Sequence, residues 1–400
     1  MTHEYFQTLR IEELRLENFR SFENARLAVQ PLTYLVGRNA AGKSNLLDAV
    51  EFMREALTDG LATAVRRRDG LVGIRRYGAP PEAPVGLAVV LTGTTMHGRP
   101  ARAVYGFRLH GATLNDIEER FVVPDALDLS FSRRGKVFEY LQPAEQDPGE
   151  ERPAGVPPDG LALPREYATV SPAWEACVHL SEMRTYQLSP AAIGSFSEIR
   201  PETNLAKRGE NAADVVASLS ADATSEEWTS VLRALERVCE GIVGVRQQSQ
   251  VDKSFLSFTR ENGIRHEFSA GHASAGTRRA LGILLALAQQ PTPSWVLMDE
   301  IEDSFHPGAF NVLLGELEAY SARFPIVLTT HSPEVLSHAS ATAERVRVVE
   351  WRDGASQIFR LNDPTAAAVG PLESVGDMLR VNGLGLSETP ERFDGGLFDP

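Results

Sequence analysis

A glycine-rich segment, GRNAAGKS from Gly37 to Ser44, has residue types and a spacing that could hold a phosphate chain. It follows an apolar stretch, 32–36, and precedes apolar residues at helical spacing that continue to Gly60. Between a strand and a helix, its backbone N–H groups would wrap a β-phosphate at the positive end of the helix dipole. Lys43 would reach the β- and γ-phosphate oxygens, and the Ser44 hydroxyl would bind Mg²⁺. The nucleotide contacts expected here are Gly37, Arg38, Asn39, Ala40, Ala41, Gly42, Lys43, Ser44 and Asn45.

An acidic pair follows a second apolar stretch. The residues WVLM, 295–298, predict a short core strand and lead directly into Asp299 and Glu300. Acidic residues often follow strands, but a phosphate-binding loop needs a second carboxylate site at the end of a buried strand. We therefore expect Asp299 to hold the water shell of a magnesium ion. Glu300, the next residue, would act as general base on the attacking water.

A histidine ends a third apolar stretch, in the segment VLTTHSP. Histidines at strand ends often have structural roles, and this interpretation stays open for His331. Parallel neighbouring strands carry their carboxyl ends to the same crevice, where open α/β sheets bind ligands. In such a crevice His331 could hydrogen-bond the γ-phosphate and respond to its loss.

The elements that must position these residues alternate between strand and helix. From residue 255 onward the pattern predicts a strand, a helix over 275–289, a strand at 295–299, a helix from Phe310, and strands at 325–331 and 345–351. This alternation indicates an α/β fold with a mostly parallel sheet. Strand-like stretches within residues 80–142 predict an additional antiparallel β layer.

The same patterns divide the chain into regions. We assign residues 1–142 to an N-terminal lobe with the phosphate-binding loop, 143–164 to a flexible loop rich in Pro, Gly and acidic residues, 165–250 to a helical insert, 251–362 to a lobe with the acidic pair and His331, and 363–400 to a C-terminal tail. Within the insert, the second of two helices is expected to start near Ser225.

Composition and charge exclude several classes of protein. The 400 residues are 42% hydrophobic and 24% charged, which is ordinary for a globular protein. No apolar run is long enough to span a bilayer and no leader is recognisable, so we expect a cytoplasmic protein without membrane contact. The net charge of −14 argues against a surface coated with basic residues for nucleic acid. Cys177 and Cys239 are expected to be reduced core thiols.

A local cluster of arginines could still form a basic patch for DNA. The cluster lies in VRRRDGLVGIRRYG and comprises Arg66, Arg67, Arg68, Arg75 and Arg76. The alternative is a solvated face, or a set of salt-bridge partners for the surplus carboxylates. The sequence leaves both interpretations open.

Five segments, FRSF, GRNAAGKSN, SAGTRR, MDEIEDSFHP and TTHSP, resemble in this order the motifs of the RecF/SMC-type branch of the ABC ATPases. The resemblance is to compact ATPases encoded beside DNA-repair and phage-defence genes, and it covers residues 10 to 350. It implies a P-loop NTPase head of ABC-ATPase type over residues 1–362, with a helical subdomain. The site residues it adds are Ser274 and Gly276 in the signature sequence, Asp303 after the acidic pair, Arg20 near the nucleotide, and Gln187 as a glutamine-loop ligand of Mg²⁺ or its water.

The sequence departs from this family in three places. The signature reads Ser-Ala-Gly-Thr rather than Ser-Gly-Gly, and no coiled-coil pattern lies between Ser44 and Ser274. Residues 332–400 are too few for the nuclease domain that the overcoming-lysogenization-defect relatives carry. The resemblance is therefore to a head without coiled-coil arms or a nuclease domain.

The resemblance implies an Mg²⁺-dependent ATPase whose heads form a homodimer around two ATP molecules. The Ser274 turn would then cap the γ-phosphate held by the second subunit, and a plain helix N-cap is the alternative. Expected partners are a second copy of the chain, an effector or nuclease protein, and DNA, in phage defence or in DNA repair. Two other functions stay open: a nucleotide-dependent scaffold with negligible hydrolysis, and the ATPase subunit of a transporter.

Overall fold

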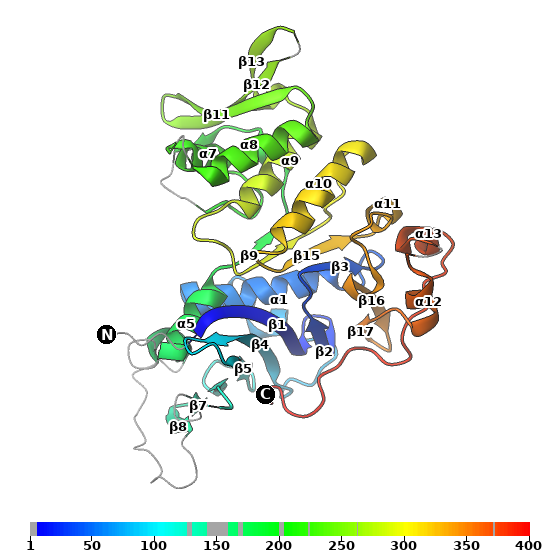
Figure 1. Cartoon of the computed structure of the whole chain (residues 1–400). Helices are drawn as coiled ribbons and strands as arrows, with labels where there is room; N and C mark the ends of the chain where they lie inside the picture. Colours follow the sequence, from blue (N-terminus) through cyan, green and yellow to red (C-terminus); the bar gives the residue numbers. More distant parts are fainter. Residues whose placement is uncertain are drawn as a thin grey trace.

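One large mixed sheet and a smaller second sheet organise the fold (Figure 1). The computed structural model describes residues 6–125, 130–141, 159–166, 171–199, 204–222, 225–261, 263–370 and 373–400. Within these residues the large sheet has 13 strands, in the order β8 (Val137–Leu141), β7 (Ser130–Arg134), β6 (Ile117–Val122), β5 (Pro100–Leu109), β4 (Val85–Thr95), β1 (Phe6–Phe19), β2 (Phe22–Ala28), β17 (Ala355–Phe359), β16 (Val346–Arg352), β3 (Leu32–Val36), β15 (Ile326–Thr330), β14 (Trp295–Met298) and β9 (Met183–Tyr186).

The part of this sheet from β16 to β9 is parallel, as the β/α alternation predicted. Its strands are nearly continuous apolar runs because both faces of the sheet are covered. Leu35 and Leu297 belong to the hydrophobic cluster on one face. Tyr34, Val296 and Leu328 belong to the cluster on the other face.

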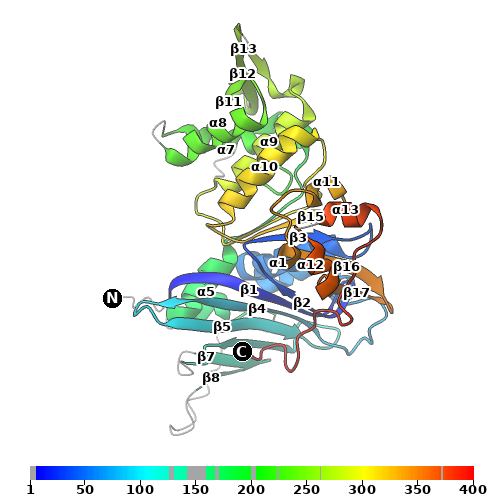
Figure 2. The same ribbon diagram turned by 45° about the vertical axis from the view of Figure 1, so that its right-hand side comes forward.

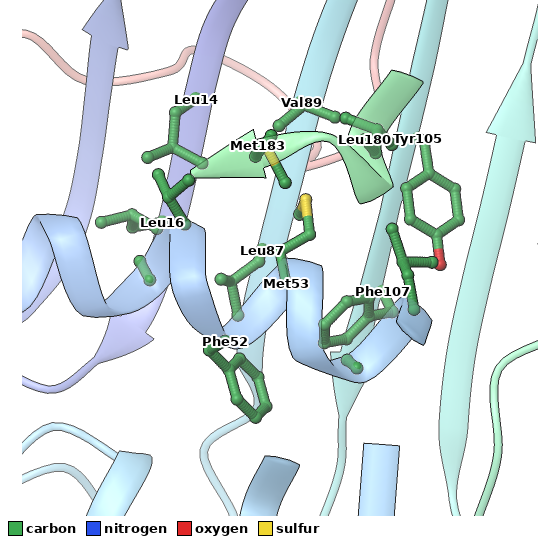
Figure 3. Close-up of a cluster of buried hydrophobic side chains, with 14 of the residues drawn as sticks. Leu14, Leu16, Phe52, Met53, Leu87, Val89, Tyr105, Phe107, Leu180 and Met183 are labelled. Carbon is green, nitrogen blue, oxygen red and sulfur yellow. The ribbon is translucent and has the colours of Figure 1, made fainter. Parts of the chain in front are cut away.

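The part of the sheet from β8 to β2 is antiparallel, and it curves around helix α1 (Lys43–Glu55). Figures 1 and 2 show α1 between the antiparallel and the parallel strands. Phe52 and Met53 of α1 share a cluster with Leu14, Leu87 and Met183, from β1, β4 and β9 (Figure 3). The predicted antiparallel layer is therefore present, and hydrogen bonds through β2 and β17 join it edge to edge to the rest of the sheet.

A second lobe covers the other face of the parallel strands. Its helices are α6 (Pro190–Ile193), α7 (Ala212–Ser220), α8 (Glu226–Val238), α9 (Ala275–Leu287) and α10 (Pro307–Tyr320), and its sheet contains β10 (Ser197–Glu198), β11 (Ile242–Gln250), β12 (Lys253–Glu261) and β13 (Arg265–Ser269). Helix α8 begins where the sequence predicted, because Ser225 Oγ accepts a hydrogen bond from the Trp228 N–H at 3.3 Å. Leu281 and Leu284 of α9 are buried against the sheet.

Shorter elements connect these parts. They are a π-helical turn (Ala56–Gly60), 3₁₀ turns at Ala270–His272 and Ala343–Arg345, and helices α2 (Leu61–Arg66), α3 (Gly70–Ile74), α4 (Leu163–Glu166), α5 (Ser171–Ser181), α11 (Pro333–Leu336), α12 (Asp363–Ala368) and α13 (Val375–Arg380). Cys177 of α5 is buried and Cys239 is partly buried, and both are free thiols. In the described ranges, no helix combines the length and apolar character needed to cross a bilayer.

The structure differs from the sequence-based division of the chain in four regions. Strands β9, β10 and β11 lie within the region assigned to helices, and β17 was not predicted. Residues 143–158 of the expected flexible loop lie outside the described residues, but Leu161 and Leu163 of the same segment are buried in the core. The expected C-terminal tail packs onto the body, where Phe393, Leu397 and Phe398 form a small cluster with residues of β4 and β5.

Candidate nucleotide-binding site

Four predicted site positions lie at one edge of the large sheet. Strands β3, β15, β14 and β9 are consecutive and parallel, so their carboxyl ends meet at that edge. The residues that directly follow these strands are Gly37, His331, Asp299 and Gln187, respectively. The convergence that the apolar stretches predicted is therefore present in the fold.

The loop between β3 and α1 needs both of its patterned glycines. Gly42 has a φ of 113°, and a Cβ there would lie 2.2 Å from Ser356 Oγ. A Cβ on Gly37 would lie 2.3 Å from the carbonyl oxygen of Val349. Ser356 Oγ also donates to the Ala41 carbonyl at 2.6 Å. The loop is therefore shaped by close contact with β16 and β17.

The ammonium group of Lys43 lies inside this loop. Its Nζ donates to the carbonyl oxygens of Gly37 at 2.6 Å and Arg38 at 3.2 Å. Burial lowers the pKa of Lys43, and the carboxylates of Asp299 and Glu300 act in the opposite direction. A phosphate group entering the loop would offer this cation stronger, charge-assisted hydrogen bonds than the carbonyls do.

The Ser44 hydroxyl and the Asp299 carboxylate meet at the sheet edge. Ser44 Oγ donates to Asp299 Oδ2 at 3.1 Å, and Thr329 Oγ1 donates to Asp299 Oδ1 at 2.5 Å. Hydroxyl and carboxylate oxygens are hard ligands that suit Mg²⁺, an ion that commonly uses one or two protein ligands together with substrate phosphates. The donor set therefore fits a magnesium ion held by Ser44 and by Asp299, directly or through water.

Glu300 combines an unusual backbone conformation with an exposed side chain. Its φ of 49° lies in the left-handed region, which is uncommon for residues other than glycine. Its N–H donates to Thr329 Oγ1 at 2.8 Å, and its carbonyl accepts from Arg279 Nη2 at 2.6 Å. Such conformations persist only where the surrounding structure fixes them, and they cluster at functional sites. The exposed carboxylate is accessible to water at the sheet edge.

His331 is held by a neighbouring carboxylate. Its backbone N–H donates to Glu302 Oε1 at 3.0 Å, and its Nδ1 lies 3.2 Å from the same oxygen. About half of the His331 side chain is exposed. This exposure is compatible with the predicted phosphate contact.

The signature turn, residues Ser274 to Thr277, lies in the second lobe, away from the phosphate-binding loop of the same chain (Figure 1). Ser274 is the N-cap of α9, and its Oγ accepts from the Thr277 N–H at 3.0 Å and lies 2.8 Å from Thr277 Oγ1. Gly276 packs closely on the loop after the acidic pair, since a Cβ there would lie 2.8 Å from the Ser304 carbonyl oxygen. The alternative N-cap role of Ser274 is therefore confirmed, and its phosphate-capping role stays a prediction.

Two predicted nucleotide contacts have side-chain partners within the protein. Arg20 Nε donates to Asp48 Oδ2 at 2.8 Å. Asn45 Nδ2 donates to Ser21 Oγ at 2.8 Å. Both residues also line a surface pocket beside α1. Their predicted contact with a nucleotide stays a prediction.

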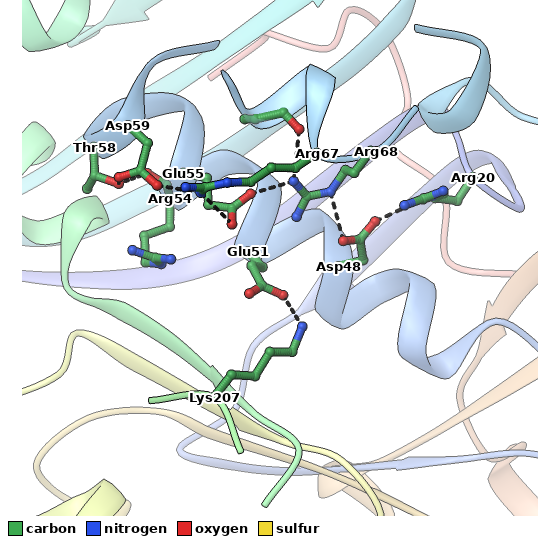
Figure 4. A network of polar contacts seen from close by, with 11 residues as sticks. Arg20, Asp48, Glu51, Arg54, Glu55, Thr58, Asp59, Arg67, Arg68 and Lys207 are labelled. Atoms are coloured by element: carbon green, nitrogen blue, oxygen red, sulfur yellow. Dashed lines mark hydrogen bonds and ion pairs between the residues drawn. The ribbon is translucent and has the colours of Figure 1, made fainter. Parts of the chain in front are cut away.

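Three members of the arginine cluster after α1, Arg67, Arg68 and Arg76, form ion pairs. Arg68 contacts Asp48 at 2.8 Å and Glu55 at 2.5 Å, and Arg67 contacts Glu55 at 3.0 Å and Asp59 at 2.5 Å (Figure 4). The carboxylates belong to α1 and the turn that follows it. These ion pairs support the interpretation of the cluster as salt-bridge partners over its interpretation as a free basic patch. Arg66, Arg75 and Arg76 bond to Thr63, to the carbonyls of Ala83 and Gly111, and to Glu23, respectively.

The sequence interpretation missed two residues that the geometry places at this edge, Thr329 and Arg279. Thr329 bonds to both Asp299 and Glu300, and Arg279 donates to the carbonyls of both. Both residues lie in sequence segments whose patterns could have pointed to them. Thr329 is a polar residue in the buried stretch VLTTH, and Arg279 is a charged residue at the start of an apolar helix.

Two family models match the sequence of this chain. One, described as "AAA domain, putative AbiEii toxin, Type IV TA system", matches residues 171–337, and another, "AAA ATPase domain", matches residues 10–63. The Old nuclease of Escherichia phage P2 is 24% identical over 393 residues, covering 87% of this chain. The chain spans 60% of the length of that relative. The sequence matches thus support ATPase domains that carry the phosphate-binding loop and the acidic pair.

Solved structures of SMC heads share the fold. A head bound to the C-winged helix domain of ScpA is 14% identical, with a TM-score of 0.54, over 90% of this chain and 100% of that one. A head from Pyrococcus furiosus, with an extended coiled coil and the C-terminal domain of ScpA, is 12% identical, with a TM-score of 0.54, over 90% of this chain and 98% of that one. The predicted resemblance and fold class are confirmed.

Proposed function

We propose that this chain, an ABC-type ATPase of the RecF/SMC kind, binds ATP and hydrolyses it with Mg²⁺ as a head that pairs with a second copy of itself. The observation that carries the proposal is the 3.1 Å approach of Ser44 Oγ to Asp299 Oδ2 beside the Lys43 ammonium. These two oxygens are the protein part of a P-loop magnesium site. Magnesium bound there would neutralise charge on the phosphates.

The residues at the sheet edge divide the chemistry between them. Lys43 exchanges its carbonyl contacts for oxygens of the β- and γ-phosphates and stabilises the charge that develops on them. Glu300 aligns a water molecule and accepts its proton as general base. His331, oriented by Glu302, contacts the γ-phosphate from the neighbouring strand.

The position of the signature turn supports a paired arrangement. Ser274 and Gly276 open α9 in the second lobe, whereas Lys43 opens α1 on the other side of the parallel strands (Figure 2). A helix N-terminus with a serine hydroxyl is well suited to bind a phosphate. In the pair, the Ser274 turn of one subunit caps the γ-phosphate bound at Lys43 of the other, with Asp303 beside it.

We infer that ATP turnover changes the geometry of the pair and so controls a partner protein or DNA. The solved SMC heads are described as bound to domains of ScpA, and the phage P2 relative is named a nuclease. Phage defence is favoured over DNA repair because one matching family is described as a putative toxin and the chain carries a net charge of −14. Carboxylates pair with Arg67, Arg68 and Arg76 of the arginine cluster and reduce the positive charge that it could offer to DNA.

Purified Glu300→Gln protein, incubated with ATP and Mg²⁺, tests this proposal. We expect turnover to fall by about 10²–10⁴-fold relative to wild type, and the variant to accumulate as an ATP-bound dimer measurable by mass. Glu236→Gln, an exposed carboxylate on α8, is the matched control and should behave as wild type. Mass spectrometry of the trapped dimer isolated from cells identifies the partner.

Two outcomes would reject parts of the proposal. Wild-type turnover no higher than that of Glu300→Gln would favour a nucleotide-dependent scaffold over an ATPase. A strict monomer that carries bound ATP would reject the paired head.

A further inference from the structure

A single buried guanidinium joins three loops at the sheet edge. Arg279 of α9 donates through Nη1 to the Leu188 carbonyl at 3.0 Å, and through Nη2 to the carbonyls of Asp299 at 3.2 Å and Glu300 at 2.6 Å. The carboxylate of Asp303 lies 3.9 Å from Nη1. Arg279 therefore binds the segment after β9, the acidic pair after β14 and the loop that follows it.

The backbone of Glu300 depends on hydrogen bonds at both of its ends. Its left-handed φ of 49° is disfavoured for a residue with a side chain. Thr329 holds the N–H from the neighbouring strand, Arg279 holds the carbonyl from the second lobe, and the Asp303 N–H adds a longer contact to the same carbonyl at 3.3 Å. Removal of the Arg279 donors would leave the Glu300 carbonyl with the longer Asp303 contact alone, and the backbone that carries the Glu300 side chain would be less restrained.

The signature turn, Ser274 to Thr277, is connected to the Arg279 contacts by helix α9 and by the loop that contains Ser304. The turn begins the same helix as Arg279, and Gly276 packs against the Ser304 carbonyl so closely that a Cβ would lie 2.8 Å from it. Ser304 also has a left-handed φ, of 73°, and it follows Asp303, the ion-pair partner of Arg279. A shift of the signature turn would therefore reach Arg279 along the helix and through this loop.

We propose that Arg279 is a positioning residue that holds Glu300 in its left-handed conformation and makes hydrolysis depend on the placement of the signature helix. The inference rests on the proposed ATPase function and on Glu300 as its general base. In a pair of heads, Ser274 faces the ATP of the partner, whereas Glu300 serves the ATP of its own chain. Arg279 then links the two composite sites through one buried side chain.

Arg279→Gln and Arg279→Lys, measured beside Arg278→Gln, test this role. Arg278 is the preceding residue of α9, and its guanidinium packs against Gly194, so the control removes the same charge from the same helix. We expect both Arg279 variants to lower kcat by about 100-fold, with the ATP affinity and the ATP-driven dimer retained. Arg279→Lys keeps the buried charge and carries the test if the glutamine variant does not fold.

Combination with Glu300→Gln separates positioning from a merely structural role. If Arg279 acts through Glu300, adding Arg279→Lys to Glu300→Gln will lower the residual turnover no further. A kcat of Arg279→Lys within about twofold of wild type, or an additive loss in the double variant, would overturn the inference. Absence of turnover in the wild type would instead reject the proposed function.

Discussion

Two buried carboxylates of this chain are held by different kinds of donor, Glu119 in the antiparallel strands and Asp299 at the edge of the parallel strands. Glu119 accepts from the backbone N–H groups of Ala162 at 2.6 Å and Leu163 at 2.9 Å, and from the Tyr105 hydroxyl at 3.0 Å. Arg133 lies 3.6 Å away. The amide donors cannot turn away, so Glu119 is a fixed structural contact between β6 and the segment before α5.

Asp299 is held instead by two hydroxyl groups. Ser44 and Thr329 each donate to one of its oxygens. A hydroxyl can rotate and offer a lone pair to a cation, whereas an amide N–H cannot. Two similarly buried carboxylates thus differ in whether their donors could rotate to admit a cation. Substitutions in the two regions should therefore separate stability from nucleotide chemistry.

The largest expected effect comes from Lys43→Ala. Loss of the ammonium removes the main positive charge that faces the phosphates, so we expect ATP turnover to fall by at least about 10³-fold. The free energy of unfolding, measured by urea denaturation, should change little, because burial already disfavours the charged form of Lys43. Lys253→Ala, an exposed lysine on β12, is the control. A Lys43→Ala protein with near wild-type turnover would contradict the assignment of the site.

Glu119→Gln is expected to lower the stability of the protein and to leave its ATP affinity unchanged. The side-chain NH₂ group of glutamine is a donor, and it would face a backbone N–H donor that in the wild type contacts a carboxylate oxygen. Arg133 would also lose its charged neighbour. We expect the free energy of unfolding to fall by about 3 kcal/mol, with the ATP affinity of the folded protein unchanged. Urea denaturation and nucleotide titration measure the two quantities. Glu139→Gln, exposed on β8, should leave both unaltered.

The smallest expected effect concerns His179 of α5, which packs on the antiparallel strands. Its Nε2 is buried and has no hydrogen-bond partner among the described residues. Burial lowers the pKa of His179 to about 4, from an ordinary value of 6.5. Between these values the unfolded chain binds more protons, so stability is present above pH 6.5 and falls as the pH drops toward 4.

His179→Gln should therefore reduce the loss of stability in acid. We expect the difference in unfolding free energy between about pH 7.5 and pH 5 to shrink by about 2 kcal/mol, measured by urea denaturation at each pH. His266→Gln, an exposed histidine on β13, should leave that difference unaltered. An identical acid profile for His179→Gln and wild type would show that this ring is not the titrating group.

The positions that the sequence could place at the strand ends are those that can be recognised from adjacent residues. Asp299 follows four apolar residues, and Lys43 sits between a strand pattern and a helix pattern. Arg279 could not be recognised in this way, because its role depends on carbonyl groups 20 to 91 residues away. Strand β9 was missed because MRTY has a weak strand pattern, and its structure depends on pairing with β14.

The position of β3 in the sheet has a consequence for folding during synthesis on the ribosome. Its two neighbours, β15 and β16, are made long after it, with β15 beginning at Ile326. At a synthesis rate of about 5–20 residues per second, the strand that leads into the P-loop waits on the order of 15–60 s for its first partner. The antiparallel strands have their partners nearby in sequence and can form during that time. Competence to bind a nucleotide is therefore acquired late on the ribosome, and a chain released before β15 is made would carry a complete P-loop sequence without a working P-loop.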